Sequence, residues 1–296
     1  MSLAEPKPGR VAPWLQANWD LRAAGNFIGG GSGTGLLIAG ACAWAGGGGY
    51  RAFAVVGLAL VALGLFCVFL EIGRQLRAAN VVLHPGASWM TREALVAPFL
   101  FACGLAAAWW EAPSFVWPTA LLAAVYLYCQ ARILQAAKGI PAWRAPRVIP
   151  LVVATGLAEG AGLLVGLLAA LAVPLPVRWP ALALAVLLVA RTVAWRRYRA
   201  GLEAPARALA ALDGGRLAFD RFGTWLPAVL AVAASVLPAG PAAAWLAAAA
   251  GVVAVAGGWQ LKITLITRAA YNQGFALPAM PVRGKGPPGP AAKPGW

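Results

Sequence analysis

Two glutamates and several polar residues are concentrated around one loop between two apolar stretches. Glu71 ends one stretch, Glu93 begins the next, and the loop 74–92 between them supplies Arg77, His84, Trp89 and Arg92. An ionisable side chain within hydrocarbon costs at least about 2.5–3.5 kcal/mol on insertion scales. Each such residue is therefore a candidate for function.

This combination of side chains suits a lipid-soluble quinone at the membrane surface. Each oxygen of a quinone ring needs a hydrogen-bond partner, and its two-electron reaction also moves two protons, so titratable groups must lie close by. We predict that Glu93, Glu71 and His84 bind the oxygens and handle the protons, and that Trp89 packs on the ring. The alternative is structural, with Glu71 paired to Arg92 and Glu93 capping its helix.

A third glutamate, Glu159, lies in the middle of the apolar stretch 148–173, among glycines that allow close helix contact. It is a candidate proton-relay group, or a buried acid held by Arg191 or Lys262 from a neighbouring helix, and we favour the structural role. Lys262 and Arg132 lie near the ends of their stretches, where long side chains reach the membrane surface.

Other cofactors and a phosphate site are not expected. A haem between helices needs two axial ligands, and the chain has one histidine, His84, with Met90 nearby. The four cysteines lie in apolar runs without a C-x-x-C pair, which predicts small buried side chains and no metal or iron–sulfur site. The glycine-rich run 29–35 lacks a following lysine and a preceding strand, so it favours helix packing, with Asn26 before it as a candidate polar contact.

The elements that carry these residues are membrane-spanning helices. Of 296 residues, 61% are hydrophobic and 11% are charged, which excludes an aqueous globular enzyme and a disordered protein. Runs of about 20 apolar residues fit a bilayer. We predict an all-α helical bundle with eight spans at residues 25–47, 52–73, 93–111, 115–136, 148–173, 178–197, 223–239 and 241–263.

The basic residues predict the orientation of this bundle. Of the 24 Lys and Arg residues, 22 fall on the side of the two termini and of the loops 74–92, 137–147 and 198–222, and two fall on the other side. The positive-inside rule therefore places both termini in the cytoplasm. The same rule explains most of the +15 net charge, so no nucleic-acid partner is expected.

The chain is expected to have three parts in the cytoplasmic membrane. Residues 1–22 form an interfacial segment with Trp14 and Trp19 at headgroup level, residues 23–270 form the eight-helix domain, and residues 271–296 form a basic cytoplasmic tail rich in Pro and Gly.

The stretches Phe69–Asn80 and Gly86–Glu93 resemble a known family: the membrane anchor subunits of dimethyl-sulfoxide-reductase and polysulfide-reductase-type molybdenum oxidoreductases. The signature of that family is a His-Leu-Gly tripeptide ending span two, an Arg-Ala-x-Asn element, and a Ser-x-x-Ser-x-Glu element opening span three. Here Glu71 stands in the place of the tripeptide histidine, and the later glutamate corresponds to Glu93. The segments 13–27 and 268–278 are similar to a subgroup linked to phenylacetyl-CoA:acceptor oxidoreductase.

This resemblance implies a subunit that passes electrons between a docked protein and menaquinone or ubiquinone. The implied partners are a four-cluster, ferredoxin-like iron–sulfur subunit and a molybdopterin catalytic subunit, both on the cytoplasmic face. Because Glu71 replaces the histidine, His84 becomes the candidate source of an imidazole. Two alternatives remain open: a secondary transporter built around Glu159, and a purely structural membrane anchor.

Overall fold

The chain forms a helical bundle. The computed structural model describes residues 12–72, 86, 88–173 and 176–274. The helical segments are α1 (Leu21–Ala45), α2 (Arg51–Glu71), α3 (Trp89–Trp110), α4 (Pro113–Ala136), α5 (Pro141–Arg144), α6 (Val148–Ala170), α7 (Arg178–Ala200), α8 (Ala206–Gly214), α9 (Arg216–Ala218), the π-helix η2 (Phe219–Trp225), α10 (Leu226–Val236), α11 (Pro241–Ile263) and the π-helix η3 (Thr264–Arg268). Among the described residues, eight helical stretches are long and apolar enough to cross a membrane. The predicted all-helical fold with eight spans is thereby confirmed.

The seventh span differs most from the prediction. The sequence predicts a loop at residues 198–222, but a single apolar helical stretch runs from Ala206 to Val236 and comprises α8, α9, η2 and α10. Within it, Ala208 and Leu212 are buried in the core. The loop prediction is therefore wrong over residues 206–222, because one apolar face is enough to hold this charged segment as a helix.

Local sequence signals explain where several helices begin. The Asp20 carboxylate caps α1 by accepting a hydrogen bond from the backbone N–H of Arg22 (2.7 Å). Ser88 caps α3 in the same way, accepting from the N–H of Thr91 (3.3 Å). Proline stands in the first turn of α4, α5 and α11, where its missing N–H costs no hydrogen bond.

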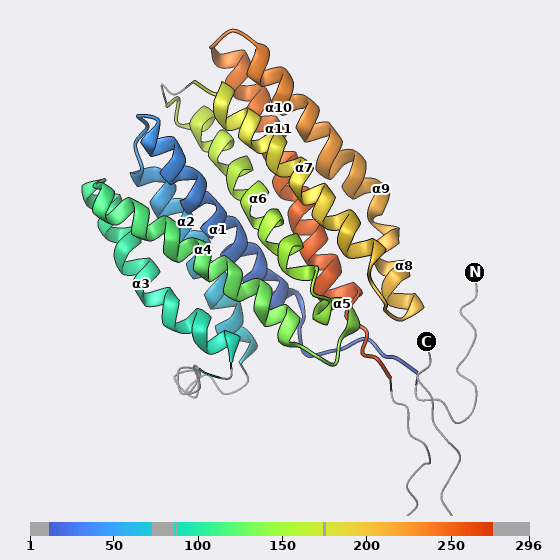
Figure 1. Cartoon of the computed structure of the whole chain (residues 1–296). Helices are drawn as coiled ribbons and strands as arrows, with labels where there is room; N and C mark the ends of the chain where they lie inside the picture. The colour runs from blue at the N-terminus through green and yellow to red at the C-terminus, as the bar shows by residue number, and fades with distance from the viewer. Residues whose placement is uncertain (1–11, 73–85, 87, 174–175, 275–296) are drawn as a thin grey trace, which may run out of the picture.

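The spanning helices form two groups of four. Helices α1, α2, α3 and α4 pack in a ring, here called the first bundle, and α6, α7, α10 and α11 pack in the second bundle. Helix α1 lies between the groups, since it contacts α2 and α4 of its own bundle and α6 of the other. In Figure 1 the first bundle is blue to green and the second is light green to red.

Glycines make the contact between the bundles close. A Cβ atom added at Gly160 of α6 would lie 1.9 Å from the backbone carbon of Gly35 in α1, and one added at Gly35 would lie 2.0 Å from the Gly156 carbonyl oxygen. Real Cβ atoms cannot approach so closely, so the two backbones meet only because these residues lack side chains. The expected packing role of the run 29–35 agrees with this contact.

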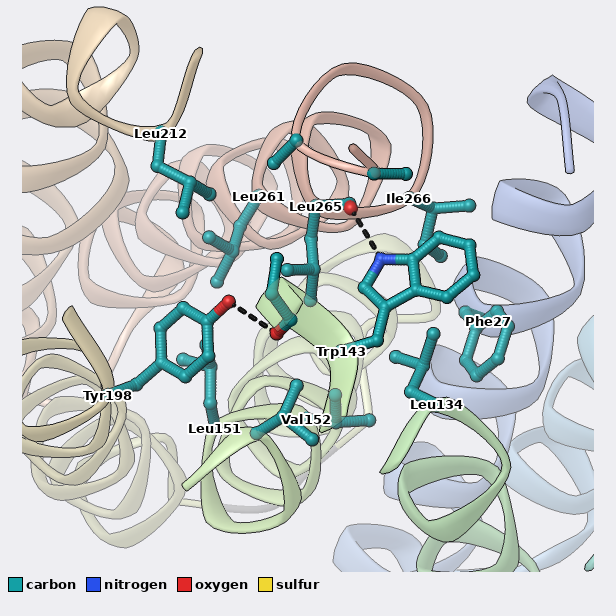
Figure 2. Close-up of a cluster of buried hydrophobic side chains, with 14 of the residues drawn as sticks. Phe27, Leu134, Trp143, Leu151, Val152, Tyr198, Leu212, Leu261, Leu265 and Ile266 are labelled. Atoms are coloured by element: carbon teal, nitrogen blue, oxygen red, sulfur yellow. Dashed lines mark hydrogen bonds between the residues drawn. The ribbon is translucent and has the colours of Figure 1, made fainter. Parts of the chain in front are cut away.

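A buried aromatic cluster holds the lower end of the bundles together (Figure 2). The indole N–H of Trp143 in α5 donates to the Leu265 carbonyl (2.8 Å), and the Tyr198 hydroxyl donates to the Ala142 carbonyl (2.7 Å). Trp19 stacks on Trp143 with ring centroids 4.8 Å apart. Trp19 therefore packs within the protein, whereas Trp14, the other expected headgroup anchor, is exposed.

The segment before α1 and the segment after η3 run side by side. Leu15 and Tyr271 form an antiparallel bridge, and the N–H of Gln16 donates to the Ala270 carbonyl (3.0 Å). The N–H of Asn272 donates to the Trp14 carbonyl (3.0 Å). These bonds place the start of α1 and the end of η3 at the same end of the molecule, called the terminal end below (Figure 1).

Candidate functional site

A cavity of about 400 Å³ opens between α1, α2 and α3 near the terminal end. Most of its wall is apolar, but Glu71, Glu93 and Asn26 also line it. The remaining lining residues are Trp19, Ala23, Phe27, Leu65, Val68, Phe69, Ile72, Met90, Ala94 and Ile133. The structure thus brings the two predicted glutamates to one cavity, from helices that the loop 74–92 separates.

Glu93 is the more deeply placed of the two acids. Its residue is 5% exposed, and it lies one turn inside α3, whose cap is Ser88. The structural alternative in which Glu93 caps this helix is therefore wrong. Tyr126 and Gln130 of α4 face the Glu93 carboxylate, because α3 and α4 pack side by side.

Several buried polar atoms at this place lack a hydrogen-bond partner. They are Oε1 of Glu93, the Tyr126 hydroxyl, Oε1 of Gln130 and Oδ1 of Asn26. The Gln130 side-chain amide donates one of its two Nε2 hydrogens to the Asn26 backbone carbonyl (3.1 Å). Buried polar atoms without partners are uncommon and point to an unseen water or ligand. Glu93 and Asn26 line the cavity, which is large enough for either, whereas Tyr126 and Gln130 do not line it.

Glu71 stands at the mouth of the cavity, where α2 ends. Arg22 donates to the neighbouring Leu70 carbonyl (2.8 Å) and forms an ion pair with Asp20 (2.9 Å). The hydrogen bond from the Arg22 guanidinium holds the pKa of Asp20 below its usual range. Asp20 lies before the first span. A cation is therefore fixed next to the mouth and Glu71.

Trp89 and Arg92 lie beside the cavity and do not line it. The Arg92 guanidinium lies 4.1 Å above the centre of the Trp89 ring, and Arg132 approaches the same ring to 4.4 Å. Tyr128 packs edge-on against this indole at 5.7 Å. The Trp89 ring thus packs against two guanidinium groups and a tyrosine and does not line the cavity, whereas Met90 and Phe69 do.

Two predicted site residues, Arg77 and His84, lie outside the described residues. The sequence did not single out Tyr126 and Gln130. Their signal was weak, because a polar residue on an otherwise apolar helix is noticed only when the helix facing it is known.

Glu159 forms a separate polar cluster between the two bundles. The Lys262 ammonium donates to Oε2 of Glu159 (2.6 Å), and so does the Ser32 hydroxyl (2.8 Å). The Trp259 indole N–H donates in turn to the Ser32 oxygen (3.0 Å). Glu159 is 0% exposed and Lys262 is 2% exposed. The prediction that Lys262 reaches the membrane surface is therefore wrong, since its side chain turns inward to this carboxylate.

Glycines make room for this ion pair. A Cβ atom on Gly31 of α1 would collide with the Lys262 ammonium, 2.4 Å away, and one on Gly258 would collide with the Glu159 carboxylate, also 2.4 Å away. Arg191 is buried nearby and donates to the backbone carbonyls of Ala254 (3.0 Å) and Gly223. Gly223 belongs to the π-helix η2. π-Helical turns are rare and are frequently found at functional sites.

Comparisons with known proteins identify no relative. No model of a protein family matches the chain, and no curated protein matches it. Among the described residues, no group of three or more His, Cys, Asp or Glu side chains is arranged to hold a metal ion.

Proposed function

We propose that this chain is the membrane-anchoring, quinone-reactive subunit of a multisubunit oxidoreductase. The observation that carries the proposal is the apolar cavity at the terminal end, with a buried carboxylate, Glu93, and a second one, Glu71, in its wall. Ligand sites in proteins are typically apolar hollows with a few well-placed polar groups. A volume of about 400 Å³ accommodates a quinone ring and the first part of its tail.

The unpartnered atoms of Glu93 and Asn26 in the cavity wall suit one oxygen of such a ring. A bound quinol supplies two electrons and two protons. Glu93 and Asn26 are placed to contact one ring oxygen within the cavity, and Glu71 is placed to hold a proton at the mouth. Glu93 and Glu71 are the carboxyl groups in the cavity wall, so they are the proposed groups for proton exchange with the bound ring.

The proposed partner subunits dock at the same end of the molecule as the cavity. The terminal end carries most of the basic residues, which supports a cytoplasmic position for this face. A four-cluster iron–sulfur subunit docked there, with a molybdopterin subunit beyond it, is the source or acceptor of the electrons. The sequence resemblance around Glu93 motivates this choice of partners.

The transporter alternative is less well supported. Glu159 is paired with Lys262 and closed in by Gly258, which suits a structural contact more than an open site at the membrane midplane.

Binding of a fluorescent quinone analogue to the purified protein tests the proposal. Glu93→Gln keeps the size of the side chain but removes its charge. A hydrogen bond to a charged group contributes about 1.5–3 kcal/mol, so we expect binding to weaken by about ten- to a hundredfold. Glu203→Gln is the matched control, because Glu203 is exposed and lies outside the cavity.

Unchanged affinity in Glu93→Gln would contradict the site. If the analogue binds normally but the purified complex carries no iron–sulfur subunit, the quinone site stands and the proposed partners fail.

A further inference from the structure

Another cavity, lined mainly by charged residues, lies at the terminal end of the second bundle, away from Glu93. It has a volume of about 410 Å³ and is lined by residues from the end of α7, from α8 and from α9. Its walls are Trp195, Arg196, Arg199, Ala200, Asp213 and Arg216. Three arginines thus face one hollow at the membrane boundary.

The carboxylates nearby neutralise these arginines incompletely. Arg199 binds Asp213 through two hydrogen bonds, Nε to Oδ1 at 2.8 Å and Nη2 to Oδ2 at 2.5 Å. Arg216 lies 3.7 Å from Asp220. Among the described residues, no carboxylate lies within ion-pair distance of Arg196. One positive charge is therefore left over, and the Asp213 pair holds the Arg199 guanidinium in a fixed orientation.

An exposed apolar stripe leads from this cavity along α7. Val186, Val189, Val193 and Arg196 follow one another at spacings of three and four residues, which places them on one face of the helix. The three valines are 67%, 52% and 43% exposed. In a membrane-spanning helix such a face contacts lipid chains. The stripe therefore joins a basic pocket to a hydrocarbon-facing surface.

We propose that this cavity binds the headgroup of an anionic phospholipid, with one acyl chain along the valine stripe of α7. Basic pockets next to spanning helices recognise anionic headgroups. Guanidinium groups hold phosphate oxygens in pairs, which a lysine cannot do. A soluble anion would use the arginines alone, whereas a phospholipid uses the arginines and the stripe together. Trp195 also lines the cavity.

Native mass spectrometry of the detergent-purified chain tests this site. Phosphatidylglycerol and phosphatidylcholine with equal acyl chains are titrated separately. We expect one phosphatidylglycerol to bind in preference to phosphatidylcholine. In Arg196→Gln this preference should fall about fivefold, since each basic residue contributes about 1 kcal/mol near a lipid surface. Ala200→Trp, which fills the cavity, should abolish the preferential binding.

Arg178→Gln is the matched control. Arg178 begins the same helix and is also exposed, but it lies at the opposite end of α7. Equal binding of the two lipids, or an equal loss in Arg178→Gln, would overturn the proposal. Displacement of the lipid by millimolar inorganic phosphate would also overturn it, because the site would then recognise a free anion. None of these results depends on the quinone site.

Discussion

At the residue scale, Glu159 and Lys262 form a buried ion pair between the two bundles. Both side chains are almost fully buried, and in the bilayer no water is available to solvate either charge. The Lys262 ammonium is 2.6 Å from the Glu159 carboxylate. Each charge is therefore stabilised chiefly by the other, with Ser32 as a third partner.

Glu159→Gln should destabilise the protein strongly. Removing one partner of a buried pair leaves the other charge uncompensated, at a cost of about 3–5 kcal/mol. We expect a clear fall in melting temperature, followed by intrinsic tryptophan fluorescence in detergent. The double variant Glu159→Gln/Lys262→Met should recover much of the loss, because it removes both charges. A single variant as stable as the wild type would contradict this structural role and favour a proton-relay role.

Sequence reasoning found the charges but not all of their partners. It placed Glu71 and Glu93 at one depth because each stands at the end of an apolar run, and the structure brings both to one cavity. It left Arg191 and Lys262 as open alternatives for Glu159, and the hydrogen bond goes to Lys262. That choice depends on the rotation of three helices about their axes, and apolar runs without a clear periodicity do not fix this rotation.

At the element scale, the contact between α1 and α6 depends on missing side chains. Gly35 and Gly160 face each other at backbone distance, whereas Gly166 of the same helix has open space around its Cβ position. These two glycines of α6 form a matched pair for a substitution test, since both substitutions add one methyl group to the same helix.

Gly160→Ala should destabilise the protein, and Gly166→Ala should not. An extra methyl group in a tight contact typically costs about 1–3 kcal/mol. Alanine in place of glycine within an open helix position adds up to about 1 kcal/mol of stability. Thermal unfolding of the two variants measures the difference directly. If Gly160→Ala is as stable as Gly166→Ala, the two helices do not pack as closely as described.

The helical segment 206–222 shows why one element escaped sequence reasoning. Its charged residues interrupt the apolar run, so a search for about 20 continuous apolar residues ends it early. The segment is nevertheless helical, because Ala208, Leu212 and Phe219 bury one face of it. The π-helix η2 overlaps the end of this segment, and its Gly223 carbonyl accepts a hydrogen bond from Arg191 of α7, a tertiary contact that the local sequence does not reveal.

At the scale of the whole molecule, the two bundles share one direction. Three spanning helices, α2, α3 and α4, lie between α1 and α6, so α1 and α6 both run away from the terminal end (Figure 1). The glycine-lined contact then joins two parallel helices, one from each bundle. A molecule arranged in this way has one end that carries both described chain ends, and the other end consists only of the turns between spans.

The distribution of charge predicts which end faces the cytoplasm. Cysteines introduced at Gly139 and at Gly240, in a variant without the four native cysteines, report on opposite ends, because Gly139 follows α4 and Gly240 precedes α11. Both positions are exposed, and a Cβ atom at either one would meet open space. In intact cells a membrane-impermeant maleimide should label Gly240→Cys, whereas Gly139→Cys should react only after the cells are opened. Labelling of both variants in intact cells would contradict a sealed eight-span topology, and the reverse pattern would place the terminal end, and with it the cavity of Glu93, on the outer face.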